Sequence, residues 1–436
     1  MEASLKQLFQ QEFSKMVAVI SKRFGLEHIE TAEDIVSETF LQATETWGRK
    51  GLPPNPPAWL YAVARQKALY RFRRNKIYET KVIPAITQDE AQSELPAFDF
   101  SQQNIRDSQL QMLFAVCTPV IASEAQIGLA LRILCGFSID EIAEAFLSRK
   151  DTINKRLFRA KEKLRAEGVR MELPSPAGIA GRLDSVLHII YLLFNEGYYS
   201  RTHPQTMRED LCFEALRLGA LLTEYDPTNL PETNALMALM CFHASRFSAR
   251  RAGGAEANED SIAGESGAGP ILYEQQNEGL WDMALIGQGM HFLERSLQGR
   301  TMSAYHLEAR IASWHCIKED SPEKWEAILA LYDQLLLVSY SPSAALNRVF
   351  ACYKVKGAAT ALEEAEKLNM EDNHFYFVLL GELYRFLDRG KAVSSFQKAY
   401  ALAKTPVEKQ GIRAILNELD VQNSGTAQSV RKPPGR

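Results

Sequence analysis

Residues 137–157 read FSIDEIAEAFLSRKDTINKRL, and this stretch decides the fold of the region around it. Ser138 is followed three residues later by Glu141, which is the spacing of a capping box that opens a helix. Ser148 and Asp151 repeat this start signal ten residues further on. We therefore expect two short helices that are joined by a tight turn.

The second of these helices has two different faces. Its apolar residues recur at helical spacing: Ile153, Leu157, Ala160 and Leu164. Its other side and flank are polar or basic: Thr152, Lys155, Arg156 and Arg159. Two short helices with a basic second one describe a helix-turn-helix, in which this face meets the major groove and its phosphates. A helical hairpin with a solvated face is the alternative, but caps, turn, charge and faces together favour DNA binding.

A second basic segment lies toward the N-terminus, in a helix that we expect over residues 57–76. Its inward arc consists of Leu60, Val63, Ala64 and Ala68. Aromatic side chains are interleaved with cations along the rest of it: Trp59, Tyr61, Tyr70 and Phe72 among Arg65, Lys67, Arg71, Arg73 and Arg74. This pattern suits single-stranded or distorted DNA, where bases stack and phosphates are neutralised. It suits a small helical core with snorkelling arginines equally well.

A third helix is expected over residues 31–47, with a start signal at Thr31–Asp34. Its apolar side consists of Ile35, Val36, Phe40, Leu41 and Trp47. Another face carries Asp34, Ser37 and Glu38. This acidic face fits a protein partner that presents arginines, or a simple interaction with the helix dipole.

Composition excludes several classes of protein. The chain has 436 residues, of which 46% are hydrophobic and 24% charged, so we expect several globular domains. No stretch approaches the roughly 20 apolar residues of a membrane span, and the N-terminus lacks a signal-peptide core. The expected compartment is therefore the cytoplasm.

Neither catalysis nor metal binding has a supporting motif. The six cysteines form no CxxC pair, so we expect buried free thiols. The histidines lack HxxxH or HExxH spacing, and no phosphate-binding or nucleophile motif is present. The polar run Asn195–Tyr198 is best interpreted as a helix end that Gly197 caps. We expect no enzyme, no cofactor and no metal.

The three segments occur in the order found in bacterial sigma factors of the extracytoplasmic-function (ECF) class, which the sequence resembles. Residues 32–40, AEDIVSETF, are similar to that family's helix for core RNA polymerase. Residues 56–74 are similar to its −10-element helix, and residues 124–166 to its −35-element helix-turn-helix. The resemblance implies two small helical domains that bind promoter DNA and the β′ clamp helices and β flap of the polymerase core.

The resemblance also implies roles for single residues. Contact with the clamp helices would come from Asp34, Ser37 and Glu38. Melting and phosphate binding at the −10 element would come from Trp59, Arg65, Lys67, Arg71 and Arg74, and the loop 49–57 would hold a flipped base. Binding to the −35 element would come from Thr152, Lys155, Arg156 and Arg159.

The rest of the chain is similar to a subgroup with a long TPR-like C-terminal extension, at residues 194–198, 280–286 and 341–348. A small/large pattern typical of a TPR helix pair is formed by Phe377, Leu380, Gly381, Tyr384, Ala392, Phe396 and Ala399. We expect an irregular helical-repeat array whose groove binds a regulatory protein.

The chain is thus expected to be all-α. The expected parts are a sigma region 2-like domain (1–81), an acidic linker (82–108), a region 4-like helix-turn-helix domain (109–172), a TPR-like extension (175–422) with a flexible loop (249–270), and a disordered tail (423–436). The linker would thread through the polymerase channel.

An alternative sigma factor, regulated by its extension, is the function that the sequence favours. A helix-turn-helix and TPR regulator that never replaces a sigma subunit is a second hypothesis. A scaffold whose basic patches are only solvated surface is a third.

Overall fold

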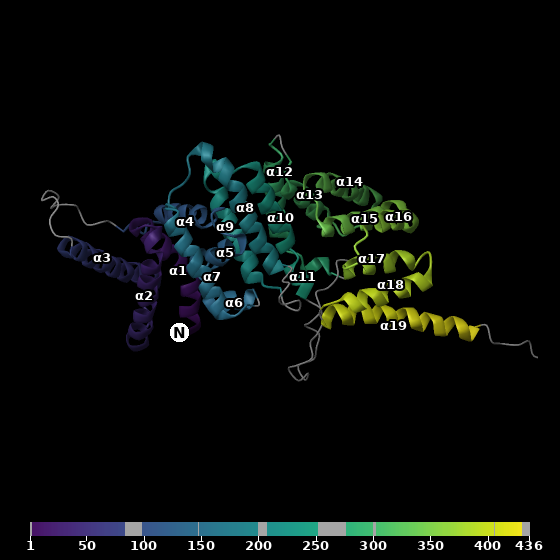
Figure 1. Ribbon diagram of the computed structural model, residues 1–436, viewed down its shortest axis with the longest axis horizontal. Coiled ribbons are helices and arrows are strands. Elements are labelled where there is room, and N and C mark those ends of the chain that lie inside the picture. Colours follow the sequence, from purple (N-terminus) through teal and green to yellow (C-terminus); the bar gives the residue numbers. More distant parts are fainter. Residues whose placement is uncertain are drawn as a thin grey trace, which may run out of the picture. The chain divides into compact units, whose positions relative to one another are not determined.

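The computed structural model describes residues 2–82, 98–146, 148–198, 207–251, 276–299, 302–404 and 406–429. All regular elements in these ranges are helices, so the all-α expectation is confirmed (Figure 1). The chain divides into two compact units. The N-terminal unit comprises Met1–Gly197 with Asp210–Asn229, and the C-terminal unit comprises Tyr198–Glu209 with Leu230–Arg436.

The N-terminal lobe of the first unit consists of three long helices: α1 (Glu2–Phe24), α2 (Ile29–Lys50) and α3 (Pro56–Val82). Phe13, Met16 and Ile20 of α1 are fully buried and form much of its core. The expected start of α2 at Thr31 is wrong, because a short 3₁₀ turn, η1 (Leu26–His28), leads directly into the helix at Ile29. Gly25, with φ of 92°, allows the chain to reverse there.

The helix-turn-helix lobe contains α4 (Gln102–Val116), α5 (Ser123–Leu129), the π-helical η2 (Ala130–Leu134), α6 (Ile139–Ala145) and α7 (Lys150–Ala166). The last seven residues of the expected linker 82–108 are helical, because Ser101 caps α4 by accepting a hydrogen bond from the Asn104 amide. Residues 83–97 of that linker lie outside the described residues.

The two lobes share one core, since α4 and η2 both pack against α1. Gln109 donates a hydrogen bond to Ser14 (3.3 Å), and Lys22 donates one to Asn104 (3.0 Å). The first 170 residues are therefore less clearly two-lobed than the sequence indicates.

Two helices of the extension also belong to the N-terminal unit: α8 (Pro176–Tyr198) and most of α9 (Glu209–Thr223). The Arg182 guanidinium donates to the Phe114 carbonyl, at the end of α4. The Arg217 guanidinium donates to the Leu134 carbonyl at 2.5 Å, at the end of η2. Both arginines satisfy carbonyls that a helix end leaves without a partner. The expected domain boundary near residue 175 therefore does not coincide with the boundary between the units.

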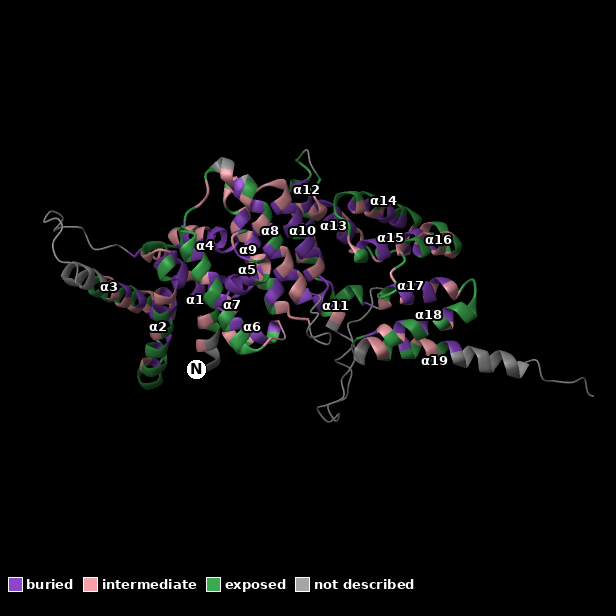
Figure 2. Ribbon diagram, in the orientation of Figure 1, coloured by how far each residue is buried: buried purple, intermediate pink, exposed green. Residues whose placement is uncertain are grey.

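The C-terminal unit is a succession of helices. After the 3₁₀ turn η3 (Asp226–Thr228) of the first unit come α10 (Pro231–Ala244), α11 (Phe247–Arg251), η6 (Glu278–Leu280), α12 (Met283–Ser296), α13 (Ala304–Trp314), α14 (Pro322–Val338), α15 (Pro342–Lys356), α16 (Ala358–Leu368), α17 (His374–Tyr384), α18 (Arg389–Leu402) and α19 (Pro406–Ser429). Figure 2 shows α10 as buried along nearly its whole length. Neighbours in sequence pack together from α12 to α19, as a helical-repeat array requires.

The helix pair α17–α18 has the expected small/large packing. Ala392, Phe396 and Ala399 are fully buried, and a Cβ atom at Gly381 would lie only 2.8 Å from the Phe396 ring. The close approach of these two helices therefore requires glycine at that position.

Two further expectations fall partly on residues that the structure does not describe. Of the expected loop 249–270, residues 249–251 are helical, and residues 252–270 lie outside the described residues. Of the expected tail 423–436, residues up to Ser429 belong to α19, and residues 430–436 lie outside. None of the described helices contains an apolar stretch of the length that a membrane span requires.

Candidate nucleic-acid interface

The helices α6 and α7 lie where the sequence predicts two short helices joined by a tight turn. The side chains of Ser138 and Glu141 cap α6 reciprocally, at 3.1 and 2.8 Å. The four apolar residues of the predicted stripe are buried: Ile153, Leu157, Ala160 and Leu164. The start signal at Ser148 is wrong, because the N-cap of α7 is Arg149 and no side chain caps it.

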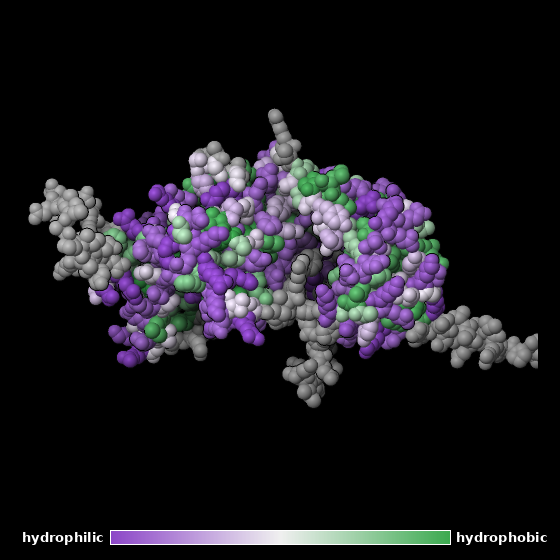
Figure 3. All heavy atoms as spheres, viewed as in Figure 1, coloured by the Kyte–Doolittle hydropathy of each residue, from purple (hydrophilic) through white to green (hydrophobic). Residues whose placement is uncertain are grey.

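The face of α7 away from that stripe meets solvent. Thr152, Lys155 and Arg159 are exposed, and Arg156 is partly buried on the flank. Mostly hydrophilic residues cover the face over α6 and α7 in Figure 3. The arrangement can place one hydroxyl and three cations against a DNA groove and its phosphates.

Phe158 is a member of this face that sequence reasoning missed. Its side chain is 59% exposed between the exposed Lys155 and Arg159. On the helical wheel Phe158 lies on the side away from the buried stripe. Its spacing alone could therefore have indicated that it is exposed. An exposed aromatic ring beside cations can contact thymine methyl groups in a major groove.

The helix α3 buries its predicted inward arc. Leu60, Ala64 and Ala68 are fully buried, and Val63 is partly buried. Arg65 and Arg74 are exposed, as a phosphate-binding role requires.

Most of the aromatic residues of α3 pack inside the lobe. Trp59 is partly buried, edge-to-face against Trp47, with ring centroids 5.3 Å apart. Tyr61 stacks on Phe100 at 5.1 Å and donates a hydrogen bond to Glu12. Burial and this carboxylate raise the pKa of the Tyr61 hydroxyl. Only Tyr70, at 66% exposure, presents an open ring among the described aromatics of α3, so the predicted stacking surface is smaller than the sequence indicates.

Glu38 of α2 connects two predicted sites. Its carboxylate accepts a hydrogen bond from Arg71 at 2.7 Å and lies 3.6 Å from the Lys67 ammonium. One predicted polymerase contact therefore pairs with two predicted −10 contacts. Because these side chains are partly exposed, the pairs contribute little to stability and can be exchanged for pairs with another partner.

The remaining residues of this α2 face point outward. Asp34 and Ser37 are exposed. Leu41 was predicted to belong to the apolar side, and this is wrong because it is 62% exposed. Its spacing of seven residues from Asp34 places both on one face of the helix. We name Asp34, Ser37, Glu38 and Leu41 the α2 outer face.

Comparison with known proteins places these helices in a family. Residues 9–77 match the family Sigma-70 region 2, and residues 182–297 match a family of unknown function, DUF6596. The chain is 32% identical over 413 residues to an uncharacterised protein of Rhizobium meliloti (strain 1021), with 93% of this chain and 94% of that protein covered. The chain belongs to the sigma-70 family, as an ECF-like sigma factor with a long C-terminal extension.

The region 2 match includes α2 and most of α3, and so includes the predicted polymerase and −10 residues. Such a sigma factor acts in transcription initiation, with polymerase core and promoter DNA as its partners. The helices α6 and α7 lie between the two matched segments. No solved structure matches the chain.

The cysteines of this sigma factor are mostly buried thiols. All six cysteines are free; five are buried and Cys316 is partly exposed. Burial raises the pKa of Cys117 and of Cys241 to about 12, so neither thiol ionises near neutral pH. Within the described ranges, no three His, Cys, Asp or Glu side chains come close enough to hold a metal ion.

Proposed function

We propose that this chain is an alternative sigma factor whose α2 outer face binds the clamp helices of RNA polymerase core. The proposal is carried by one observation: within the segment that matches Sigma-70 region 2, this face exposes two carboxylates and an apolar Leu41 side by side. A surface of this kind complements an arginine-bearing helix pair, in which charge steers the encounter and the leucine is desolvated.

At the −10 element, α3 provides the DNA contacts. Arg65 and Arg74 are free of α2 and bind phosphates, while Tyr70 offers a ring on which an unpaired base stacks. Lys67 and Arg71 leave Glu38 when a phosphate replaces the carboxylate as their partner. Trp59, held by Trp47, shapes the adjoining loop 49–57.

At the −35 element, α7 enters the major groove of duplex DNA. Lys155 and Arg159 are placed to bind base edges or phosphates, and Thr152 stands at the exposed N-terminal end of the helix. Arg156 on the flank binds phosphate, and Phe158 packs against thymine methyls.

The extension, in this proposal, regulates the factor through protein contacts. Support comes from α8 and α9, which pack in the N-terminal unit and bond to the ends of α4 and η2. The array of helices α14–α18 offers the repeated surface on which TPR-like proteins bind a partner.

Run-off transcription tests the proposal. Purified core polymerase and the full chain are combined on DNA from the region upstream of the chain's own gene. The proposal predicts a defined transcript that Asp34→Ala with Leu41→Ala strongly reduces. Glu326→Ala, which removes an exposed acid of α14 outside the region 2 match, is the control and should leave the transcript unchanged.

A DNA-binding regulator that is not a sigma subunit is the second candidate, since α6 and α7 are two short helices joined by a tight turn and α7 is basic. It predicts tight, sequence-specific binding to duplex DNA without polymerase. It also predicts that the α2 outer-face variants behave like the unaltered chain.

A further inference from the structure

A strongly basic segment runs from the end of α17 through α18 to the start of α19. Residues 384–413 contain seven Lys or Arg and two Asp or Glu, a net charge of +5, whereas the whole chain carries −4. The three helices pack side by side in chain order (Figure 1). A local excess of charge that is opposite to the charge of the whole protein indicates a surface for an anionic partner.

Two lysines of α18 lie over aromatic rings of α17. Lys391 Nζ is 5.3 Å from the centre of the Tyr384 ring, and Lys398 Nζ is 5.4 Å from the centre of the Phe377 ring. The lysines are seven residues apart, which corresponds to about 10.5 Å along α18. Both lysines are exposed, so the rings hold the side chains while the ammonium groups stay in contact with solvent.

Two cations of α19 lie on the other side of α18. Lys409 Nζ is 5.8 Å and Arg413 Cζ is 5.3 Å from the centre of the Tyr400 ring of α18. Arg413, which is exposed, also donates a hydrogen bond to the Tyr400 hydroxyl. Tyr400 follows Lys391 by nine residues, which is about two and a half helical turns, so the two lie on opposite sides of α18. The two pairs of cations therefore flank this helix.

Between the two pairs, α18 exposes a strip of uncharged residues: Gly390, Ser394, Gln397 and Ala401. The strip is one helix wide, roughly 10 Å, which is comparable to the width of the major groove of B-DNA, about 12 Å. The pairs can therefore meet phosphates on both sides of a groove. We name Lys391, Lys398, Lys409 and Arg413 the α18 basic face.

The cations of the α18 basic face are available to a partner. None of the four forms an ion pair with a described residue. The two acids of the segment have other roles. Asp388 caps α18 by accepting a hydrogen bond from the Lys391 amide at 3.1 Å, and the Glu408 carboxylate lies 3.4 Å from His374 Nε2. A partner can therefore bind these cations without first breaking an ion pair.

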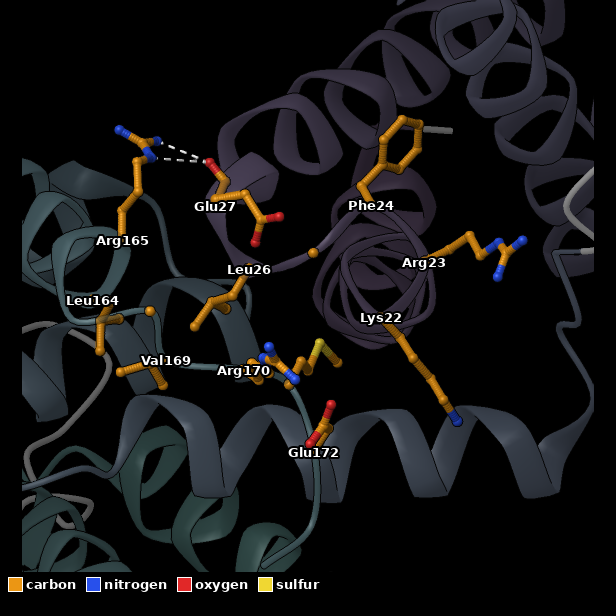
Figure 4. Close-up of a pocket in the computed structure, with 13 residues that line it drawn as sticks. Lys22, Arg23, Phe24, Leu26, Glu27, Leu164, Arg165, Val169, Arg170 and Glu172 are labelled. Carbon is orange, nitrogen blue, oxygen red and sulfur yellow. Dashed lines mark hydrogen bonds between the residues drawn. The ribbon is translucent and has the colours of Figure 1, made fainter. Parts of the chain in front are cut away.

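A cavity of about 640 Å³ between the ends of α1 and α7 also has cations on its wall, but they do not converge (Figure 4). Arg165 points toward the Glu27 carbonyl, to which it donates at 2.9 Å, and Arg23 points away from Arg170. The C-terminal ends of α1 and α7 border the cavity, and helix C-termini attract cations rather than anions. The α18 basic face is therefore the better anion site.

We propose that the α18 basic face binds the phosphate backbone of promoter DNA outside the −35 and −10 elements, as a third DNA contact of this sigma factor. Phosphates of one strand repeat about every 3.4 Å along the duplex, so the spacing of Lys391 and Lys398 equals about three steps. That the DNA is promoter DNA rests on the proposed function, whereas phosphate binding rests on the face alone.

An acidic protein segment is a different partner, and the uncharged strip favours DNA over it. The strip offers the hydrogen-bonding side chains of Ser394 and Gln397 and no large apolar side chain. Protein interfaces bury an apolar core, whereas DNA interfaces are polar and retain water.

The first experiment measures the binding of the full chain to a short duplex of random sequence at several salt concentrations, by fluorescence anisotropy. Each phosphate contact contributes about 0.9 to the slope of log K against log salt concentration. Lys391→Ala with Lys398→Ala should therefore lower this slope by about 2, and Lys409→Ala with Arg413→Ala should do the same. Lys391→Arg with Lys398→Arg keeps both charges and should keep the slope.

Lys367→Ala is the matched control for these variants. Lys367 is an exposed lysine of α16 in the same unit, but it pairs with Glu364 at 2.5 Å, so its loss should leave the slope unchanged. Circular dichroism checks that each variant keeps its helices. If both double variants have the slope of the control, the face does not bind DNA and the proposal is overturned. If they instead lose binding to polyglutamate, the face belongs to an acidic protein partner.

The second experiment is hydroxyl-radical footprinting of the full chain with core polymerase on promoter DNA. The unaltered chain should protect backbone positions outside the two elements that Lys391→Ala with Lys398→Ala leaves open, while the elements stay protected. Identical footprints would refute the promoter contact. If the unaltered chain gives no footprint with polymerase, the proposed function fails, while the salt dependence still decides whether the face binds DNA.

Discussion

Arg217→Ala tests whether the extension is a structural part of the helix-turn-helix lobe. The Arg217 side chain lies on α9, donates to the Leu134 carbonyl at 2.5 Å and pairs with Glu214 at 2.8 Å. Its removal leaves the carbonyl at the end of η2 without a charged donor. Such a loss costs about 1–2 kcal/mol. For a unit of this size, the midpoint of thermal unfolding should fall by roughly 2–8 °C.

The assay is thermal unfolding of the full chain, together with hydrogen exchange of the α6–α7 amides. Arg106→Ala is the matched control, because Arg106 pairs with Glu224 at 3.4 Å and both side chains are half exposed. Exposed pairs of this kind contribute less than about 1 kcal/mol. If the two variants have equal midpoints and equal exchange at α6–α7, the extension does not support this lobe. The result also decides how truncations are designed. A chain ending at 172 lacks Arg182 and Arg217, whereas one ending at 229 keeps every residue of the N-terminal unit.

Further predictions concern single contacts. Gly381→Ala should destabilise the C-terminal unit by about 1–3 kcal/mol in urea unfolding, because its Cβ would meet the Phe396 ring; an unchanged midpoint would contradict the close packing of α17 on α18. Glu38→Ala should change stability by less than about 1 kcal/mol and yet weaken core binding. Arg159→Ala should lower the salt dependence of −35 duplex binding by about one phosphate contact, whereas Phe158→Ala should weaken binding without altering that dependence.

Local spacing was enough to predict the helices α6 and α7 and the buried face of α7. The capping box of Ser138 and Glu141 and the stripe from Ile153 to Leu164 depend on residues three or four apart, which a sequence displays directly. The burial of Leu60, Ala64 and Ala68 follows from the same periodicity.

The errors arise where a distant segment decides the outcome. In the sequence Glu33 is an acidic residue near the start of a helix. The cations that it binds, Arg132 and Lys161, lie 99 and 128 residues further along the chain. Arg182 and Arg217 likewise donate hydrogen bonds to carbonyls far upstream. The N-terminal unit therefore extends beyond residue 175, where the sequence predicted a domain boundary. No local pattern encodes such pairings. Leu41 is a different case: it shares a helix face with the exposed Asp34, seven residues earlier, so its spacing already indicated exposure although its apolar side chain indicated a core position.

The aromatic residues of α3 show the same limit in the candidate site. Interleaved rings and cations suit both stacking on bases and a small core. Only the positions of Trp47 and Phe100 decide that Trp59 and Tyr61 pack mainly inside the lobe.

Equilibrium binding of the purified full chain to RNA polymerase core at low salt tests the account most directly. We predict saturable binding of one chain per core, weakened at least about tenfold by Asp34→Ala with Leu41→Ala and unaffected by Glu326→Ala of α14. Absence of binding, or equal binding by all three chains, would contradict it.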